Sequence, residues 1–234
     1  MSEHKILQVK NLKVNFDVSS EGDMPWTKAK KLQAVNNVSF DLNSGETLGI
    51  VGESGCGKST LARAIVKMVP ADSGKVIWFG NDLLTLNKSE MRQHRKQIQM
   101  IFQDPLASLN PRMNIGEIIA EPLRTHYPKT PESDVKERVK DVMNKVGLLD
   151  NLVNRYPHEF SGGQCQRIGI ARALILKPKL IICDEPVSAL DVSIQAQVVN
   201  LLMDLQEEMD LTLIFIAHDL SVVKHISTKI MVLY

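Results

Sequence analysis

Cysteine is scarce in this chain of 234 residues, which contains only Cys56, Cys165 and Cys183. An odd number of cysteines without regular spacing implies neither a disulfide framework nor a zinc site, and it fits a reducing, cytosolic compartment. The sequence also lacks any run of about 18 or more apolar residues, so it predicts no membrane-spanning helix. Residues 1–5 lack the apolar segment of a signal peptide.

An excess of charge of either sign is missing as well. The 28 lysines and arginines nearly balance the 27 acidic residues, which leaves a net charge of +1. This balance argues against a strongly electropositive nucleic-acid binder, although it is compatible with a local basic patch. Hydrophobic residues make up 44% of the chain, which is ordinary for a globular protein of this length.

The most specific motif present is the glycine-rich stretch at 52–59, which matches G-x-x-x-x-G-K-[ST]. An apolar strand is expected before it at 48–51 and a helix after it at 61–66, which is the order that a phosphate-binding loop requires. Its glycines let backbone N–H groups point at phosphate oxygens, and the helix adds its positive end. We expect the following residues to bind the phosphates of a nucleoside triphosphate: Gly52, Glu53, Ser54, Gly55, Cys56, Gly57, Lys58, Ser59 and Thr60.

Four polar residues carry the expected chemistry of this site. Lys58 can reach the β- and γ-phosphates, and the hydroxyl of Ser59 can bind Mg²⁺. The apolar strand at 179–183 leads into Asp184, a carboxylate expected to hold Mg²⁺ through water. Glu185 follows directly and can polarise an attacking water as a general base. The alternative, a surface turn with two acids, is disfavoured because the preceding strand is wholly apolar.

A second anion-binding turn is predicted at residues 161–164, Ser-Gly-Gly-Gln, where a helix that continues to residue 175 begins. Ser161 is a good N-cap, and Gly162 and Gly163 leave backbone N–H groups exposed before Gln164. On local grounds alone, an ordinary capped helix explains this turn equally well.

The order of the expected strands predicts an α/β fold with a mostly parallel sheet. Alternating residues at 6–16 and 34–42 indicate a small antiparallel sheet before the phosphate loop, with a long hairpin loop at 17–33. Strands as apolar as those at 179–183 and 211–217 need both faces covered, so helices are expected on both sides of the parallel sheet.

A helical lobe is expected within this core. Residues 104–111 read as a loop held by two prolines, and residues 115–123 and 133–146 have helical periodicity. We therefore predict a single nucleotide-binding domain over residues 1–234. Its ATPase core contains residues 1–103 and 166–234, and its inserted helical subdomain contains residues 104–165.

Taken together, these motifs resemble those of the ATP-binding-cassette ATPases, the nucleotide-binding subunits of ABC transporters. The turn at 161–164 is similar to the signature of that family, and residues 188–191 are similar to its D-loop. Gln103 looks like the Q-loop glutamine and His218 like the switch histidine. Phe16 is similar to the aromatic residue that stacks on adenine, with core packing as its alternative role. Trp26 could instead lie near the base.

The resemblance implies ATP and Mg²⁺ as cofactors and assigns roles to individual residues. It implies that Gln103 and His218 act in catalysis with Lys58 and Glu185. It further implies that Gln103 binds Mg²⁺ together with Ser59 and Asp184. The signature residues Ser161, Gly162, Gly163 and Gln164 would act in trans, on the nucleotide held by a partner.

Residues 99–111 resemble one branch of this family, the oligopeptide and dipeptide permeases, which also includes nickel and glutathione importers. Two departures occur: Phe160 replaces the commoner leucine, and Cys165 stands where a glutamine or basic residue is usual. The strand that starts at residue 229 stops at Tyr234, and the C-terminal segment of the branch is expected to be absent.

The implied partners are two transmembrane permease subunits and a second ATPase subunit, either identical or homologous. An extracytoplasmic peptide-binding protein would take part indirectly, and no nucleic acid is expected. The implied location is the cytoplasmic face of the inner membrane, as a peripheral subunit. The alternatives are an importer of nickel or glutathione, or a non-transport ATPase of DNA repair, chromosome organisation or translation.

Overall fold

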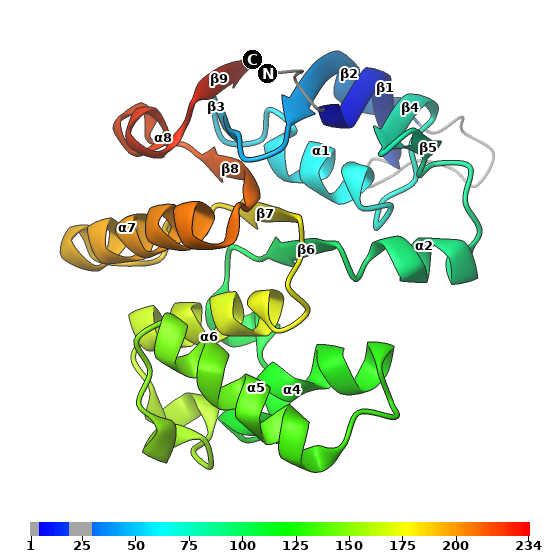
Figure 1. The fold of residues 1–234 in the computed structure, drawn as a ribbon. Coiled ribbons are helices and arrows are strands. Elements are labelled where there is room, and N and C mark those ends of the chain that lie inside the picture. Colours follow the sequence, from blue (N-terminus) through cyan, green and yellow to red (C-terminus); the bar gives the residue numbers. More distant parts are fainter. Residues whose placement is uncertain (1–4, 19–29) are drawn as a thin grey trace.

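The computed structural model describes residues 5–18 and 30–234, which form two β-sheets and the surrounding helices (Figure 1). The first sheet is antiparallel with the strand order β2-β1-β4-β5, and the second is parallel with the order β6-β7-β8-β3-β9. The predicted α/β fold with an antiparallel and a parallel sheet is therefore confirmed. Within the described residues, no helix combines the length and apolar character needed to cross a membrane.

The strands and helices vary in length, from the two residues of β5 to the 18 residues of α7. The antiparallel sheet contains β1 (Lys5–Val18), β2 (Lys30–Asn43), β4 (Ser73–Trp78) and β5 (Asn81–Asp82). The parallel sheet contains β3 (Thr47–Gly52), β6 (Ile98–Ile101), β7 (Leu180–Asp184), β8 (Thr212–Ala217) and β9 (Lys229–Leu233). The α-helices are α1 (Lys58–Ile65), α2 (Lys88–His94), α3 (Pro105–Ser108), α4 (Ile115–His126), α5 (Glu132–Lys145), α6 (Gly162–Leu174), α7 (Val192–Met209) and α8 (Leu220–Ile226), with 3-10 turns at Asp150–Leu152 and Pro157–Glu159.

The prediction of a long hairpin loop at 17–33 is wrong at both ends, because a strand extends into each end of this range. β1 continues to Val18, β2 begins at Lys30, and Phe16 pairs with Leu32 across the two strands. The ladder extends into this polar stretch because backbone hydrogen bonds between neighbouring strands do not require apolar side chains. Trp26, for which a place near the base was considered, lies outside the described residues.

One further expectation needs correction. The proline-held loop at 104–111 contains the short helix α3, because Asp104 accepts a hydrogen bond from the Ala107 N–H at 2.9 Å and Pro105 fits the first helical position. Elsewhere, the two-residue strand β5 pairs with β4 at the edge of the antiparallel sheet.

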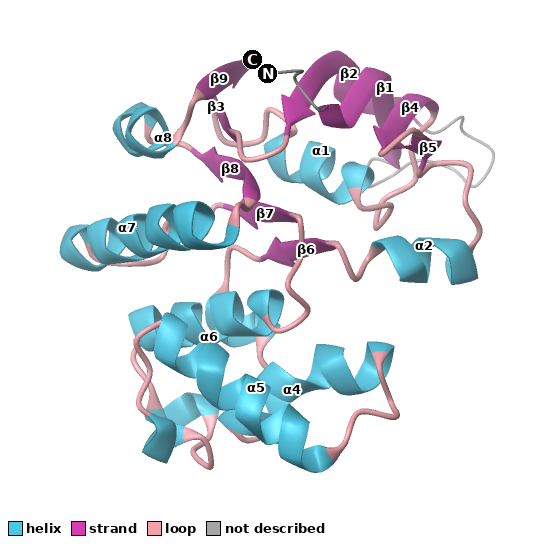
Figure 2. Ribbon diagram, in the orientation of Figure 1, coloured by secondary structure: helices cyan, strands magenta, loops and turns pink. Residues whose placement is uncertain are grey.

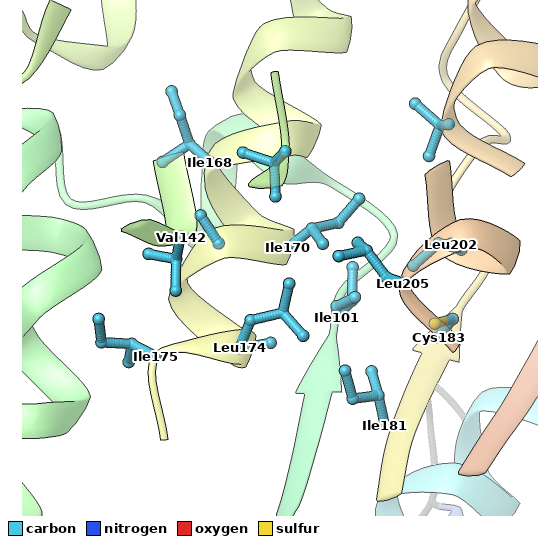
Figure 3. Packing of buried hydrophobic residues seen from close by; sticks show 14 of the residues in the cluster. Ile101, Val142, Ile168, Ile170, Leu174, Ile175, Ile181, Cys183, Leu202 and Leu205 are labelled. Carbon is cyan, nitrogen blue, oxygen red and sulfur yellow. The ribbon is translucent and has the colours of Figure 1, made fainter. Parts of the chain in front are cut away.

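The lobe between β6 and β7 is helical throughout (Figure 2). Its last helix, α6, runs through the expected boundary after residue 165 and connects the lobe to the sheet. In Figure 3, Ile170 and Leu174 of α6 point toward Ile101 of β6. The lobe and one face of the parallel sheet therefore share one hydrophobic core.

Successive residues of the parallel strands face opposite sides of the sheet. On β7, Ile181 and Cys183 pack into the cluster that contains α6 and α7, whereas Leu180 and Ile182 pack into the cluster that contains α1 and the antiparallel sheet. Both faces are buried, as the wholly apolar strands predict.

Leu174→Ala tests the shared core. Leu174 is fully buried, so its truncation leaves a cavity, and we expect the free energy of unfolding to fall by about 2–5 kcal/mol. Leu149→Ala is the matched control, because Leu149 is 67% exposed and its change is expected to stay within about 0.5 kcal/mol. Urea unfolding measures both values, and equal effects would contradict this account of the core.

Candidate functional site

The phosphate-loop residues lie at the carboxyl end of the parallel sheet. The loop connects β3 to α1, and the strand between β3 and β7 in the sheet is β8. Asp184 ends β7, and His218 directly follows β8. Residues distant in sequence therefore meet at one edge, because the carboxyl ends of parallel strands all lie on the same side of a sheet.

Two glycines of the loop occupy positions that a residue with a side chain would not fit. Gly55 and Gly57 adopt φ angles of +83° and +96°, which residues with side chains rarely adopt. A Cβ atom on Gly57 would also stand 2.0 Å from the carbonyl oxygen of Ala34 on β2. The loop is thus held directly against the antiparallel sheet.

The ammonium group of Lys58 is enclosed by its own loop. It donates hydrogen bonds to the carbonyl oxygens of Gly52 at 2.9 Å and Glu53 at 2.7 Å, and it lies 3.9 Å from Oε1 of Glu185. Lys58 is only 4% exposed. A positive charge with little access to water interacts strongly with phosphate oxygens, which suits the role predicted for this lysine.

Ser59 and Asp184 are joined directly. The Ser59 hydroxyl donates a hydrogen bond of 2.6 Å to Oδ1 of Asp184. The buried Oδ2 has no hydrogen-bond partner among the described residues and lies 3.7 Å from Arg63. Burial raises the pKa of Asp184, opposed by the Ser59 hydrogen bond and by the charge of Arg63. A hydroxyl beside a carboxylate with an unpaired oxygen fits Mg²⁺, which prefers oxygen ligands and retains water molecules. Sequence reasoning missed Arg63.

Glu185 has an unusual backbone conformation that directs its side chain into the site. Its φ angle is +49°, and its N–H donates to the carbonyl oxygen of Ile216 at 3.0 Å. Gln103 Nε2 donates to Glu185 Oε2 at 3.2 Å, and His218 Nδ1 lies 3.9 Å from the same oxygen. A non-glycine residue in the left-handed region is strained, and such strain is common at functional sites.

A hollow of about 320 Å³ is lined by half of the predicted site residues, whereas Gly52, Glu53, Cys56, Asp184 and His218 are not among its lining residues. The residues lining it are Phe16, Leu32, Gln33, Ala34, Ser54, Gly55, Gly57, Lys58, Ser59, Thr60, Gln103 and Glu185. Phe16 is 38% exposed here, so its ring is accessible rather than buried in a core. Leu32, Gln33 and Ala34 were missed by sequence reasoning; the only signal was the isolated apolar Leu32 after two lysines.

The signature turn, residues 161–164, is not among the residues that line this hollow. It caps α6 as predicted: Gln164 N–H donates to Ser161 Oγ at 3.4 Å, and Ser161 N–H donates to Gln164 Oε1 at 3.0 Å. Ser161 and Gly162 are exposed. The turn therefore offers its free N–H groups to a group outside the hollow of its own chain.

The structure explains the unusual Cys165. This residue is fully buried, its Sγ lies 3.6 Å from the carbonyl oxygen of Pro157, and burial raises its pKa. A small apolar side chain fits this position because the neighbouring lobe residues close over it. Phe160 packs partly buried against the same core.

Comparisons with known proteins agree with this geometry. The model of the ABC transporter family matches residues 35–188. The chain is 68% identical to the oligopeptide transport ATP-binding protein OppF of Salmonella typhimurium, covering 98% of this chain and 69% of that protein. It is 52% identical to the oligopeptide transport ATP-binding protein AppF of Bacillus subtilis, covering 100% of this chain and 70% of that protein.

A solved structure gives the same result for the fold. The dimeric ATP-binding cassette MJ0796, in a post-hydrolysis state bound to ADP and Pi, is 28% identical with a TM-score of 0.84, covering 97% of this chain and 94% of that chain. The chain therefore belongs to the ABC transporter family. Within this family it is an ATP-binding and ATP-hydrolysing subunit.

Asp184→Asn tests how much the buried carboxylate of Asp184 lowers the free energy of unfolding. Because folding raises the pKa of Asp184, the folded chain favours the protonated form, and stability is lost as pH rises above the ordinary value of 3.8. We expect Asp184→Asn to raise the unfolding free energy of the nucleotide-free chain at neutral pH by about 1 kcal/mol, while ATP hydrolysis is lost. Thermal unfolding at several pH values should show the difference shrinking in acid. A difference that grows in acid would contradict the account.

Cys56 offers a second test, by alkylation. Cys56 is partly exposed within the phosphate loop, whereas Cys165 and Cys183 are buried, and burial raises the pKa of Cys183 to about 12. We expect iodoacetamide to modify Cys56 alone and to abolish ATP binding by bulk, with ATP protecting the thiol. Cys56→Ser should bind ATP and resist inactivation, as mass spectrometry and nucleotide binding can verify. Modification that leaves ATP bound normally would disprove the placement.

Proposed function

We propose that this chain energises the import of oligopeptides or dipeptides by binding and hydrolysing ATP at the surface of a membrane permease. The observation that carries the proposal is the hollow that joins Lys58, Ser59, Gln103 and Glu185 in a chain related to peptide-transport ATP-binding proteins. These relatives favour peptide transport over a role on DNA or in translation, and over nickel or glutathione import.

Several residues in and beside the hollow have a chemical task in hydrolysis. Lys58 neutralises charge on the β- and γ-phosphates, because phosphoryl transfer depends on charge stabilisation more than on covalent chemistry. Glu185 accepts a proton from the attacking water, and Gln103 and His218 hold the Glu185 carboxylate and face the γ-phosphate. Phe16 stacks on the adenine.

Mg²⁺ would be held by Ser59, Asp184 and Gln103, and it would neutralise phosphate charge. The Oδ2 atom of Asp184 supports this assignment, because it is buried and receives no hydrogen bond from the described residues. The charge of Arg63, at 3.7 Å, lowers the pKa of Asp184 and so opposes the larger effect of burial.

The site of one chain is incomplete on the open side of the γ-phosphate. The signature turn supplies exposed N–H groups but does not line its own hollow. We infer that ATP joins this chain to a second ATPase subunit head to tail, so that each signature turn completes the neighbour's site. The dimeric cassette with a similar fold supports this arrangement. Hydrolysis removes the bridging charge and lets the pair open.

The permease would dock on a groove of about 360 Å³ between the helical lobe and the core. The groove is lined by residues of β6, α4 and α6, including Gln99 and Pro122. Phe102 also lines it and directly precedes Gln103. Motion at the γ-phosphate would thus reach two transmembrane permease subunits, which receive peptide from an extracytoplasmic binding protein. The chain would work as a peripheral subunit at the cytoplasmic face of the inner membrane.

Glu185→Gln tests the proposed cycle. The amide keeps the size of the side chain but cannot accept the proton, so we expect ATP binding to persist, hydrolysis to fall about 100-fold or more, and a dimer to accumulate. Light scattering after size exclusion measures the dimer, with this chain alone and with its second ATPase subunit. Glu137→Gln on the exposed face of α5 is the control and should behave as wild type.

Undiminished hydrolysis by Glu185→Gln would remove Glu185 from the role of base. The transport role has a separate readout: wild-type hydrolysis should rise with permease subunits in vesicles and stay unchanged with DNA. Stimulation by DNA alone would overturn it.

A further inference from the structure

The two glycines of the signature turn lie against another segment of their own chain. A Cβ atom on Gly163 would stand 2.6 Å from Cγ2 of Ile194, closer than any side chain tolerates. A Cβ atom on Gly162 would stand 3.3 Å from Cδ2 of Leu190. Ile194 lies at the start of α7 and Leu190 lies in the turn before it, and both side chains are partly buried against the core. The backbone of the signature turn thus rests on two apolar side chains.

This apolar support follows closely after Glu185 in a hydrogen-bonded segment of the chain. The Ser188 hydroxyl donates to the carbonyl oxygen of Glu185 at 3.1 Å, and Ser188 N–H donates to the same oxygen at 3.3 Å. Gln195 Nε2 donates to the carbonyl oxygen of Leu190 at 2.8 Å, which closes the turn onto α7. A chain of hydrogen bonds and one helical turn therefore links Glu185 to Ile194.

We propose that Ile194, with Leu190, is a positioning residue that sets the place of the signature turn, and that Gly163 is a glycine because Ile194 occupies the space of a side chain. This inference rests on the proposed function, in which the signature turn acts on the partner's nucleotide. It adds that the turn which completes the neighbour's site is held by residues close in sequence to the chain's own Glu185.

A different reason for the glycine makes the opposite prediction. If Gly163 were required only so that the backbone can approach the partner's phosphate, an added methyl group would block that approach whatever stands at position 194. If Ile194 sets the requirement, shortening Ile194 provides the space that the methyl group needs. The two explanations therefore differ in whether a second substitution restores activity.

The test uses the assembled transporter, with this chain, its second ATPase subunit and the permease. We expect Gly163→Ala to lower kcat by about 100-fold, because small displacements of positioned groups have effects of this size. KM should change little, since the signature turn does not line the hollow of its own chain. The double variant Gly163→Ala, Ile194→Ala should recover at least about tenfold of this loss.

Gly169→Ala is the matched control on the same helix. A Cβ atom there meets nothing within 4 Å, so this variant should keep wild-type activity and stability. Ile194→Ala alone loosens the turn without a clash and should lower kcat several-fold at unchanged KM. ATP binding by each isolated variant, together with its thermal unfolding, identifies any chain that fails to fold.

Each outcome decides a different point. Loss of activity in Gly163→Ala without recovery in the double variant overturns the role of Ile194. It leaves the proposed action of the signature turn on the partner's nucleotide unaffected. Wild-type hydrolysis by Gly163→Ala overturns both this inference and the proposed action across the pair. If Gly163→Ala does not fold, unchanged kcat in Ile194→Ala overturns the inference, and a reduced kcat supports it.

Discussion

The hydrogen bond between Ser59 and Asp184 joins the two halves of the catalytic site. It connects the start of α1 to the end of β7, segments 125 residues apart in the chain. The contact exists because β7 and β3 lie on either side of β8 with their carboxyl ends together. The other catalytic groups take their positions from this edge of the sheet: Lys58 from the loop after β3, Glu185 from the residue after β7, His218 from the residue after β8, and Gln103 from the second residue after β6.

The same edge concentrates unfavourable features that the rest of the fold offsets. Asp184 is fully buried with one oxygen unpaired, Glu185 has a positive φ angle, and Gly57 fits only because it lacks a side chain. Stable proteins usually restrict such features to sites where they serve a function. The large cores on both faces of the parallel sheet supply the compensating stability.

The helical lobe connects the hydrophobic core of the sheet to an exposed surface of the chain. α6 has the signature turn at its N-terminus, and its apolar residues share a core with the sheet. Its exposed turn is positioned by packing within its own chain, while its N–H groups face outward. One helix can therefore transmit a change in the core to a surface that a neighbour contacts, because packed elements move as rigid bodies rather than deform gradually.

Much of the fold and site could be predicted from local patterns. The phosphate loop, the wholly apolar strands and the capped helix at Ser161 are encoded in consecutive residues, since backbone conformation and burial depend on short-range sequence. The placement of Asp184 after a buried strand was equally readable. Most misses occurred where distant contacts decide: the strands extending into 17–33, the contribution of Leu32, Gln33 and Ala34, and Arg63 near Asp184. The helix α3 was missed although its signal is local, in the cap formed by Asp104 and in Pro105.

The sequence by itself determined the chemistry: which residues can hold phosphate, bind a cation or accept a proton. Only the tertiary structure decided that Gln103 meets Glu185, that Ala34 excludes a side chain from Gly57, and that Ile194 stands where Gly163 would carry one. The physical reason is that side-chain type is a local property, whereas the distance between two atoms depends on how all the intervening elements pack.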